Sequence, residues 1–348
     1  MKGSSLPSQI APSPSPSNTM SATTLPTITT CVPSQETVFH DEQTLGDLLC
    51  SPPKLLSSSS DIVSFDSSIK APFDAIRRLF DYLRGNPEVA TQLNEVYPSR
   101  GIVKTAATKN AQADQKFTID LSVKRNSQIP QDLHATLARA GFDEVMNFFD
   151  KADKAFVAPI LSILSEQAGV DLQPTHRDGN INYRLCDYNP ITADPLSDNG
   201  CGEHTDYGTF SIIFQDGTPG LEMEDSSQPG SWVQVPGDAT VVLSGWCAVI
   251  LSGGHIRATR HRVRRIANVR RLSAVIFVAP DLDTKLKPLS GVKAVRPFTQ
   301  VIMNGVLTVG EFKKVMGKKW RRREGNEDSD GAEDYATQDN DIVKLVWG

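Results

Sequence analysis

The second half of the chain consists of short apolar runs separated by turn residues. After Gly169 these runs recur at close spacing and are rich in β-branched and aromatic residues: NINYRLCDY, TFSIIFQD, GLEME, SWVQV, ATVVLSG, CAVILSG, TRHRV and LSAVIFVA. Such runs, bounded by glycine, proline, asparagine or aspartate, are typical of β-strands. Many short strands in succession must each bury a face, which predicts a β-sandwich or a jelly roll.

The stretch before Gly169 has a helical pattern instead. Apolar residues recur three and four positions apart from about residue 68 to 84, and a second helical stretch runs from about residue 131 to 168. Each stretch should present one apolar face. A Gly-Asn-Pro sequence at 85–87 ends the first stretch, and Gly169 ends the second. RGIVKTAA and KFTIDLSV, which lie between them, are expected to be extended.

The two ends of the chain differ in composition from its centre. Residues 1–60 are rich in Ser, Thr and Pro and lack the apolar surface that would offset the entropy cost of ordering, so we expect disorder there. Near the other end, TVGEFKKVMGKKW predicts a helix, and the basic KKWRRR precedes the acidic EDSDGAED. A solvated helix end is the main interpretation of the basic run, and a nuclear-localisation signal is the alternative.

These patterns divide the chain into five parts. They are a disordered segment over 1–60, a helical part over 61–175, a jelly-roll core over 176–284, a C-terminal helical segment over 285–325 and a flexible acidic tail over 326–348.

Charge and cysteine content narrow the function classes. The net charge of −5 argues against a general nucleic-acid binder. No apolar stretch approaches the roughly 20 residues of a membrane span, and no basic segment followed by an apolar one predicts a secretory signal. The N-terminus is Ser-rich like a transit peptide, but it has no arginine before residue 36. Five cysteines without a CxxC pair fit reduced intracellular thiols, so we expect a cytoplasmic protein.

GEHTDYGTF places His204 two positions before Asp206. In extended backbone, residues i and i+2 project to the same side, so both side chains can converge on one metal ion. His261, in ATRHRV, is the best candidate for a third ligand, and His255, in the turn-like SGGH, is its rival. Two histidines and one carboxylate are typical of non-haem Fe(II) oxygenases. A general acid–base pair and chance remain open as alternatives.

The run RRLSAVIFVA carries a second group of polar residues. In a strand, Arg271 and Ser273 share one face with Val275, whereas Arg270 has the opposite parity. A buried guanidinium needs an anionic partner, and its planar fork suits a carboxylate. The strand holds no acidic residue, so the partner is either a small dicarboxylate ligand or a distant Asp or Glu.

NYRLCDYNP supplies a third group. Arg184, Cys186 and Tyr188 share one face of an expected strand. Tyr188 could present its hydroxyl to the same ligand as Arg271. The alternative is a tyrosine that packs in the core with its hydroxyl satisfied.

In their order and spacing, these motifs resemble the Fe(II)- and 2-oxoglutarate-dependent dioxygenases of the isopenicillin N synthase-like superfamily. The resemblance runs from about Arg184 to Pro280, through HTDYGTFSIIFQDGTPGLEME, VPGDATVVLSG, RATRHRV and RLSAVIF. RGIVKTAATKNAQADQKFTIDLS and TVGEFKKVMGKKW are weaker likenesses outside that region. The resemblance implies a mainly β fold with flanking helices, a double-stranded β-helix (jelly roll). It matches the iron ligands to His204, Asp206 and His261, and the 2-oxoglutarate-binding residues to Arg271, Ser273 and Tyr188.

The resemblance also implies an activity. It implies an oxidoreductase that uses Fe(II), O2 and 2-oxoglutarate, with ascorbate as an optional reductant, and that releases succinate and CO2. The expected substrate is a small molecule of specialised metabolism that is hydroxylated, desaturated or otherwise oxidised. We expect a monomer that binds neither nucleic acid nor membrane, with no catalytic residue beyond the iron ligands. An iron-dependent oxidase that does not use 2-oxoglutarate, and a non-catalytic binding protein on the same fold, are the alternatives.

The chain departs from the family pattern at several positions. The usual N-terminal strand with an NHG-type motif is missing, and Ser/Pro-rich sequence stands in its place. Cys186, Asn189 and Trp246 also replace residues that are common in members. These departures put the choice of substrate in doubt more than the iron chemistry.

Overall fold

The computed structural model describes residues 69–97, 101–104, 113–225, 227–323 and 338–348. The segment 1–60, which we expected to be disordered, lies outside the described residues.

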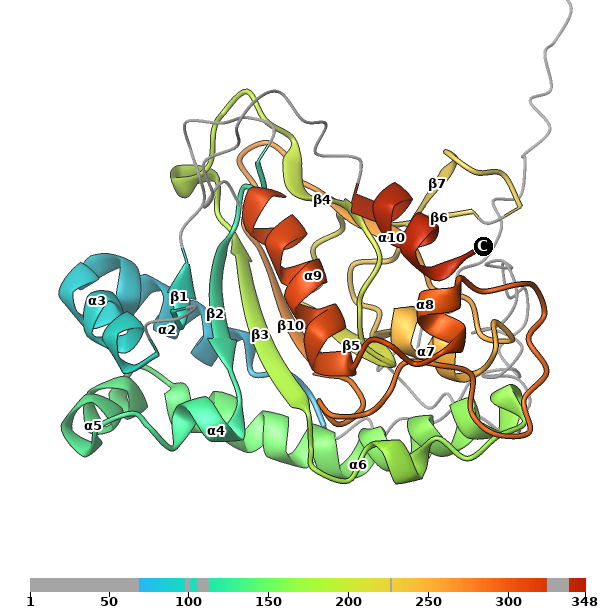
Figure 1. The fold of residues 1–348 in the computed structure, drawn as a ribbon. Helices are drawn as coiled ribbons and strands as arrows, with labels where there is room; N and C mark the ends of the chain where they lie inside the picture. Colours follow the sequence, from blue (N-terminus) through green and yellow to red (C-terminus); the bar gives the residue numbers. More distant parts are fainter. Residues whose placement is uncertain (1–68, 98–100, 105–112, 226, 324–337) are drawn as a thin grey trace, which may run out of the picture.

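Two antiparallel sheets form the centre of the molecule (Figure 1). The larger sheet has the order β1 (Val103–Lys104), β2 (Phe117–Leu121), β3 (Ile181–Tyr188), β10 (Arg271–Val278), β5 (Phe210–Gln215), β8 (Val241–Ser244). The smaller sheet has the order β4 (Asn199–His204), β9 (His261–Arg264), β6 (Leu221–Glu224), β7 (Trp232–Gln234).

The two sheets pack face to face. Side chains of both sheets meet in one buried cluster, which includes Ile213 and Val275 from the larger sheet and Leu221 and Val263 from the smaller. Alternate residues of β10 divide between this cluster and the one on the outer face of the larger sheet, as the period of a strand requires. The jelly roll that the sequence predicted is confirmed.

Helices cover the outer face of the larger sheet. The long helix α6 (Phe142–Ala168) runs along it, and α2 (Phe73–Gly85) lies beside α6 (Figure 1). Their apolar faces pack against the outward-facing side chains of β3, β5 and β10. The remaining N-terminal helices are α3 (Pro87–Val96), α4 (Val123–Asn126) and α5 (Gln131–Arg139). Among the described residues, no helix is both long and apolar enough to cross a bilayer.

A second group of helices contributes side chains to an apolar cluster separate from that of α2 and α6. It comprises α7 (Trp246–Leu251), α8 (Gln300–Met303), α9 (Val309–Arg323) and α10 (Gln338–Val346). Helix α9 confirms the helix expected from TVGEFKKVMGKKW. Short 3-10 turns also occur at Gln173–Thr175 and Pro190–Thr192.

Three expectations need correction. The helical stretch over 131–168 is two helices, because Gly141 has a φ of 102° and a side chain there would meet the backbone of Ala75. CAVILSG was expected to form a strand but lies in α7, where every residue is buried and the apolar run is equally compatible with a helix. The tail is not flexible throughout 326–348, since α10 buries Ile342 and Val346 in an apolar cluster.

Candidate metal and cosubstrate site

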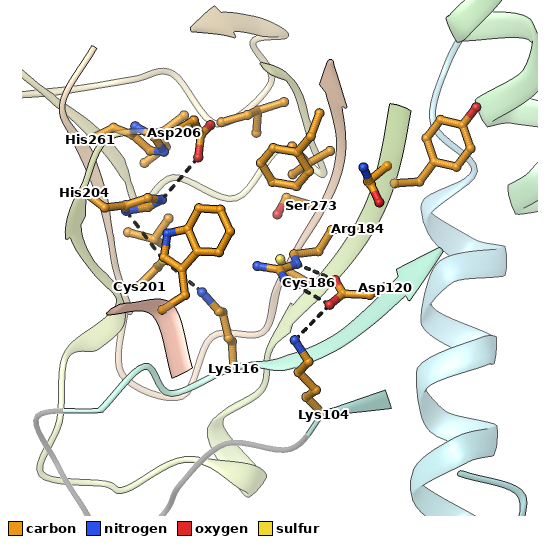
Figure 2. A pocket seen from close by; sticks show the side chains of 18 of the residues that line it. Lys104, Lys116, Asp120, Arg184, Cys186, Cys201, His204, Asp206, His261 and Ser273 are labelled. Carbon is orange, nitrogen blue, oxygen red and sulfur yellow. Dashed lines mark hydrogen bonds and ion pairs between the residues drawn. The ribbon is translucent and has the colours of Figure 1, made fainter. Parts of the chain in front are cut away.

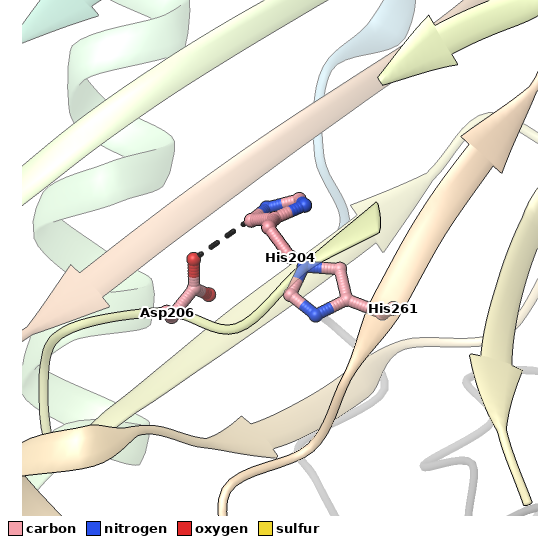
Figure 3. A group of neighbouring side chains, drawn as sticks. All are labelled: His204, Asp206 and His261. Atoms are coloured by element: carbon pink, nitrogen blue, oxygen red, sulfur yellow. Dashed lines mark ion pairs between the residues drawn. The ribbon is translucent and has the colours of Figure 1, made fainter. Parts of the chain in front are cut away.

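The smaller sheet brings His204, Asp206 and His261 together. His204 is the last residue of β4 and His261 is the first of β9, and the register of the two strands pairs them directly. Their ring centroids lie 4.1 Å apart. One ligand-type atom of each residue, Asp206 included, lies within 4.8 Å of the others, and all three residues are buried (Figure 3). The spacing and donor types suit one metal ion.

Asp206 reaches the group from a loop rather than from a strand. It lies two residues beyond the end of β4, and its side chain converges with that of His204 as the His-x-Asp spacing predicted. The Oδ1 atom of Asp206 is 3.8 Å from Nε2 of His204. The hydroxyl of Ser211, on β5, donates a hydrogen bond to Oδ2 of Asp206. Ser211 therefore fixes the orientation of the carboxylate.

Backbone carbonyls orient both imidazole rings. Nδ1 of His204 lies 2.8 Å from the carbonyl oxygen of Gly202, and Nδ1 of His261 lies 3.1 Å from that of Thr259. Donation from Nδ1–H to these carbonyls leaves Nε2 with its lone pair available, which is the usual arrangement of a metal-binding histidine. The rival His255 is exposed, and its Nε2 contacts the carbonyl of Lys293. It does not line the cavity that holds the other two histidines.

Arg271 lies on the facing sheet with unsatisfied donors. Its side chain is 3% exposed, and its Nη2 donates to Oε1 of Gln215 at 2.8 Å. Its Nε and Nη1 atoms are buried without a hydrogen-bond partner among the described residues. Buried guanidinium donors are rarely left unsatisfied. The distant Asp or Glu that was the alternative partner is not found in the described part of the chain, and a carboxylate ligand fits the vacant donors.

Ser273 and Tyr188 lie next to Arg271 on the same face of the sheet. The strand register pairs Arg271 with Tyr188 and Ser273 with Cys186. The guanidinium of Arg271 stands over the ring of Tyr188 at 5.1 Å from its centroid. Burial raises the pKa of Tyr188 well above its usual value, so its hydroxyl stays protonated at neutral pH. The three residues expected to bind 2-oxoglutarate thus form one polar strip.

A single cavity contains both groups. It encloses about 1040 Å³ of empty space, its open mouth included, and its lining includes all six predicted residues. The lining also includes six residues that the sequence patterns did not single out as site residues: Lys104, Lys116, Asp120, Arg125, Lys313 and Trp320. The first three fall in the KTAATKNAQADQKFTID stretch, where the only signal was its weak likeness to the family.

Lys104, Arg125 and Arg184 surround the carboxylate of Asp120. Asp120 and Arg184 are paired across β2 and β3, and Nη2 of Arg184 donates to Asp120 at 3.0 Å. Nζ of Lys104, on β1, is also 3.0 Å from that carboxylate (Figure 2). Burial raises the pKa of Asp120, but the charges of Arg184, Lys104 and Arg125 outweigh burial and hold it far below its usual range. Asp120 is therefore ionised at neutral pH.

Lys116 forms a separate buried contact beside the histidines. Its Nζ lies 2.9 Å from Oδ2 of Asp114 and 2.9 Å from Sγ of Cys201. The same sulfur is 4.0 Å from Nδ1 of His204. Because Asp114 neutralises Lys116, this contact adds little net charge to the cavity.

Helix α9 covers part of the cavity. Trp320 packs against Tyr207, with ring centroids 5.6 Å apart. Nζ of Lys313 lies 5.4 Å from the centroid of the Tyr207 ring. Both α9 side chains line the cavity, so this helix forms one of its walls.

Comparison with known proteins gives a family match in the central region. Residues 180–280 match the family model of the 2OG-Fe(II) oxygenase superfamily. The match covers less than a third of the chain, and it supports the likeness to this superfamily that the sequence motifs indicated. The matched region contains β3 to β10 and all six predicted site residues.

Individual relatives match over part of their length. The chain is 31% identical to scopoletin 8-hydroxylase of Arabidopsis thaliana over 42% of this chain and 42% of that protein. It is 40% identical to clavatol oxidase of Penicillium crustosum over 26% of this chain and 27% of that protein. A 2-oxoglutarate-dependent dioxygenase of Talaromyces stipitatus is 38% identical over 32% and 35% of the two chains. The matches thus span less than half the length of these relatives.

Solved structures support the fold. A 2OG-Fe(II) oxygenase family protein from Caulobacter crescentus superposes with a TM-score of 0.54 and 19% identity, over 74% of this chain and 87% of that one. A full-length Neurospora crassa protein, solved in complex with alpha-KG and thymine, gives a TM-score of 0.54 and 16% identity, over 76% and 86% of the two chains.

Proposed function

We propose that this protein is an Fe(II)- and 2-oxoglutarate-dependent oxygenase that oxidises a small organic metabolite. One observation carries the proposal. A buried His-Asp-His group and a buried arginine with two vacant donors face the same cavity. The first suits Fe(II) and the second suits the far carboxylate of 2-oxoglutarate.

The side chains present fit both cofactors. His204, Asp206 and His261 would hold Fe(II) on one side and leave positions for other ligands. When bound, this iron supplies oxidation of the substrate by O2, coupled to decarboxylation of 2-oxoglutarate to succinate and CO2. Ascorbate is proposed only as a supporting reductant.

The larger sheet would hold the cosubstrate. Arg271 would pair with the far carboxylate of 2-oxoglutarate through its vacant Nε and Nη1, and Ser273 would add a hydrogen bond. Gln215 and Tyr188 fix the guanidinium from two sides. The apolar lining at Ile213, Leu221 and Val263 keeps bulk water from these contacts, which strengthens them.

The relatives support the proposed substrate class. Their names, such as scopoletin 8-hydroxylase, clavatol oxidase and gibberellin 3-beta-dioxygenase, indicate small plant and fungal metabolites. We extend this class to the present chain and place its activity in specialised metabolism. We further propose that it acts as a cytoplasmic monomer, without a nucleic-acid or membrane partner.

The test is a turnover assay with a panel of candidate metabolites. Purified protein is loaded with Fe(II) and 2-oxoglutarate without air, incubated with each metabolite, exposed to O2 and analysed for succinate and for products about 16 mass units heavier or about 2 lighter. Succinate formed in step with product supports the proposal. Product with O2 uptake but no succinate would instead indicate an oxidase, and failure to bind iron would indicate a non-catalytic binding protein.

A further inference from the structure

The cavity carries more positive charge than the proposed cofactors require. Among the described residues that line it, six are Lys or Arg and only two are Asp or Glu. The charges of Fe(II) and of the 2-oxoglutarate dianion cancel each other, so their binding leaves this excess in place. This positive charge is not spread evenly over the cavity. Lys116 is neutralised by its ion pair with Asp114, and Arg271 faces the proposed 2-oxoglutarate site.

Half of the excess lies in one group on β1, β2, β3 and α4. We call Lys104, Asp120, Arg125 and Arg184 the cationic cluster. Three cations surround a single carboxylate, with Lys104 and Arg184 in direct contact with Asp120 (Figure 2). Arg125 is buried, and its guanidinium stands 5.0 Å from the centroid of the Tyr97 ring. Asp120 offsets one of the three charges and holds two of the cationic heads in place.

The cluster lies beyond the proposed 2-oxoglutarate site. Arg184 is opposite Val275 in the register, two residues from the Cys186–Ser273 pair and thus about 7 Å farther along the sheet. Burial falls in that direction, from 2% exposure at Ser273 to partial exposure at Asn182 and Phe277. Arg184 therefore lies between the proposed 2-oxoglutarate site and the more exposed end of the same two strands.

Aromatic side chains line the cavity, and one of them lies beside the cluster. The guanidinium of Arg184 lies 5.8 Å from the centroid of the Phe277 ring, and Trp320 lines the same cavity from α9. Planar aromatic walls favour a planar, apolar ligand body. Partly buried cations in such a cavity favour a ligand that carries a negative charge.

We propose that the cationic cluster binds the carboxylate of an aromatic acid and that this acid is the class of substrate the enzyme oxidises. The inference rests on the proposed function, because it assigns the second substrate of the same cavity. The alternative role for the cluster is purely structural, as an ion-pair network that joins β1, β2 and β3.

Ligand binding distinguishes these roles. The full chain, loaded with Fe(II) and 2-oxoglutarate without air, is titrated by calorimetry with benzoate, phenylacetate, cinnamate and 2-naphthoate, and with the primary amide of each. We expect at least one acid to bind at least about tenfold more tightly than its amide, because only the acid gains a charge-assisted contact. If no acid binds more tightly than its amide, the proposal is wrong.

Substitution of Lys104 locates the contact. Lys104→Met should lower the affinity for the preferred acid by about tenfold and leave the affinity for its amide unchanged, whereas Lys104→Arg should retain the preference. Lys154→Met is the matched control, because Lys154 forms an ion pair with Asp150 on the surface of α6, outside the cavity. Equal affinities for the acid in Lys104→Met and Lys154→Met would assign the cluster a structural role.

Failure of this inference can be told apart from failure of the proposed function. Succinate production without a preference for acids would overturn only the inference about the substrate. An acid preference without succinate production, in protein that binds iron, would overturn the proposed 2-oxoglutarate chemistry and leave the anion site standing.

Discussion

The two sheets that face each other across the cavity supply different kinds of residue. The smaller sheet and the loop after it supply a compact set of candidate metal ligands, His204, Asp206 and His261, held by backbone carbonyls and by Ser211. The larger sheet supplies Arg271 and Ser273 at one end and the cationic cluster at the other. Under the proposed function, the smaller sheet would hold the iron, and the outer end of the larger sheet would select the substrate.

Function is therefore distributed unevenly along the chain. Residues 180–280, which match the superfamily model, contain the three candidate metal ligands and the three residues expected to bind 2-oxoglutarate. Lys104, Asp120 and Arg125 lie before that region, and Lys313 and Trp320 lie after it. The side chains that line the proposed substrate-binding end of the cavity come mostly from parts of the chain where the family likeness is weakest.

Removing a metal ligand should have the largest effect. His204→Ala, Asp206→Ala or His261→Ala should each abolish succinate formation and strongly reduce bound Fe(II), because a site with three protein ligands cannot spare one. Iron content after desalting and succinate yield measure this. His255→Ala is the control, since that ring is exposed and lies outside the cavity. Loss of iron in His255→Ala but not in His261→Ala would reverse the assignment.

Arg271→Gln should have the next largest effect. Loss of a charge-assisted contact to a buried carboxylate costs about 2–5 kcal/mol, which corresponds to a rise in the KM for 2-oxoglutarate of about thirtyfold or more. Initial rates of succinate formation at varied 2-oxoglutarate measure it. Iron content should stay normal, because Arg271 belongs to the other sheet.

Arg270→Gln separates the two neighbouring arginines. Arg270 makes a two-point contact with the buried Asp187, through Nε at 2.9 Å and Nη2 at 2.7 Å, and does not line the cavity. This substitution should lower the melting temperature and leave the KM for 2-oxoglutarate nearly unchanged. Similar KM increases in Arg270→Gln and Arg271→Gln would contradict the assignment of Arg271 to the cosubstrate.

Ser211→Ala should weaken the metal site without removing a ligand. Ser211 donates to Oδ2 of Asp206, and loss of a residue that orients a metal ligand typically costs about tenfold or more in metal affinity. Competition with a chelator of known affinity measures the change. Ser244→Ala is a suitable control, because Ser244 is also buried on the larger sheet but donates to the Arg257 carbonyl. Unchanged iron affinity in Ser211→Ala would mean that the loop alone orients Asp206.

The sequence could predict the part of the site that local pattern determines. Strand parity placed Arg271 and Ser273 on one face, and the structure places them there, opposite Tyr188 and Cys186. The His-x-Asp spacing predicted convergence, although Asp206 lies in a loop. The sequence left two candidates for the third ligand, His261 and His255. The pairing of β4 with β9 brings His261 next to His204, and a local sequence pattern does not contain this long-range contact.

The rest of the site arises from long-range packing. Lys104, Asp120 and Arg184 meet only because β1, β2 and β3 are neighbours, and nothing in the sequence around Lys104 indicates that order. Trp320 reaches the cavity because α9 packs back over Tyr207. The prediction of a strand at CAVILSG failed for a related reason. A short, fully buried apolar segment has no amphipathic period that would distinguish a helix from a strand.

The smallest effect we predict is a difference in acid stability at the outer end of the larger sheet. The pKa of Asp120 is lowered on folding because Arg184, Lys104 and Arg125 together outweigh the opposing effect of burial. A carboxyl group whose pKa falls on folding stabilises the protein above its unfolded pKa of about 4, and this contribution is lost as the pH falls below that value. The Asp120→Asn variant lacks this stabilising contribution at every pH.

Urea unfolding of the wild type and of Asp120→Asn between about pH 7 and pH 3 tests this. The difference in unfolding free energy should be constant from about pH 7 to about pH 5, and should then shrink by at most about 1.4 kcal/mol per pH unit below about pH 4, the limit for one proton. Asp153→Asn is a control from outside the cationic cluster, because burial, the first cause at that site, raises the pKa of Asp153. A carboxyl group whose pKa is raised on folding gives the opposite pH dependence, so its variant should not reproduce the narrowing gap. A difference in unfolding free energy that stays constant down to about pH 3 would mean that the three cations do not lower the pKa of Asp120 as their positions indicate. The positive charge assigned to this end of the cavity would then have to be revised.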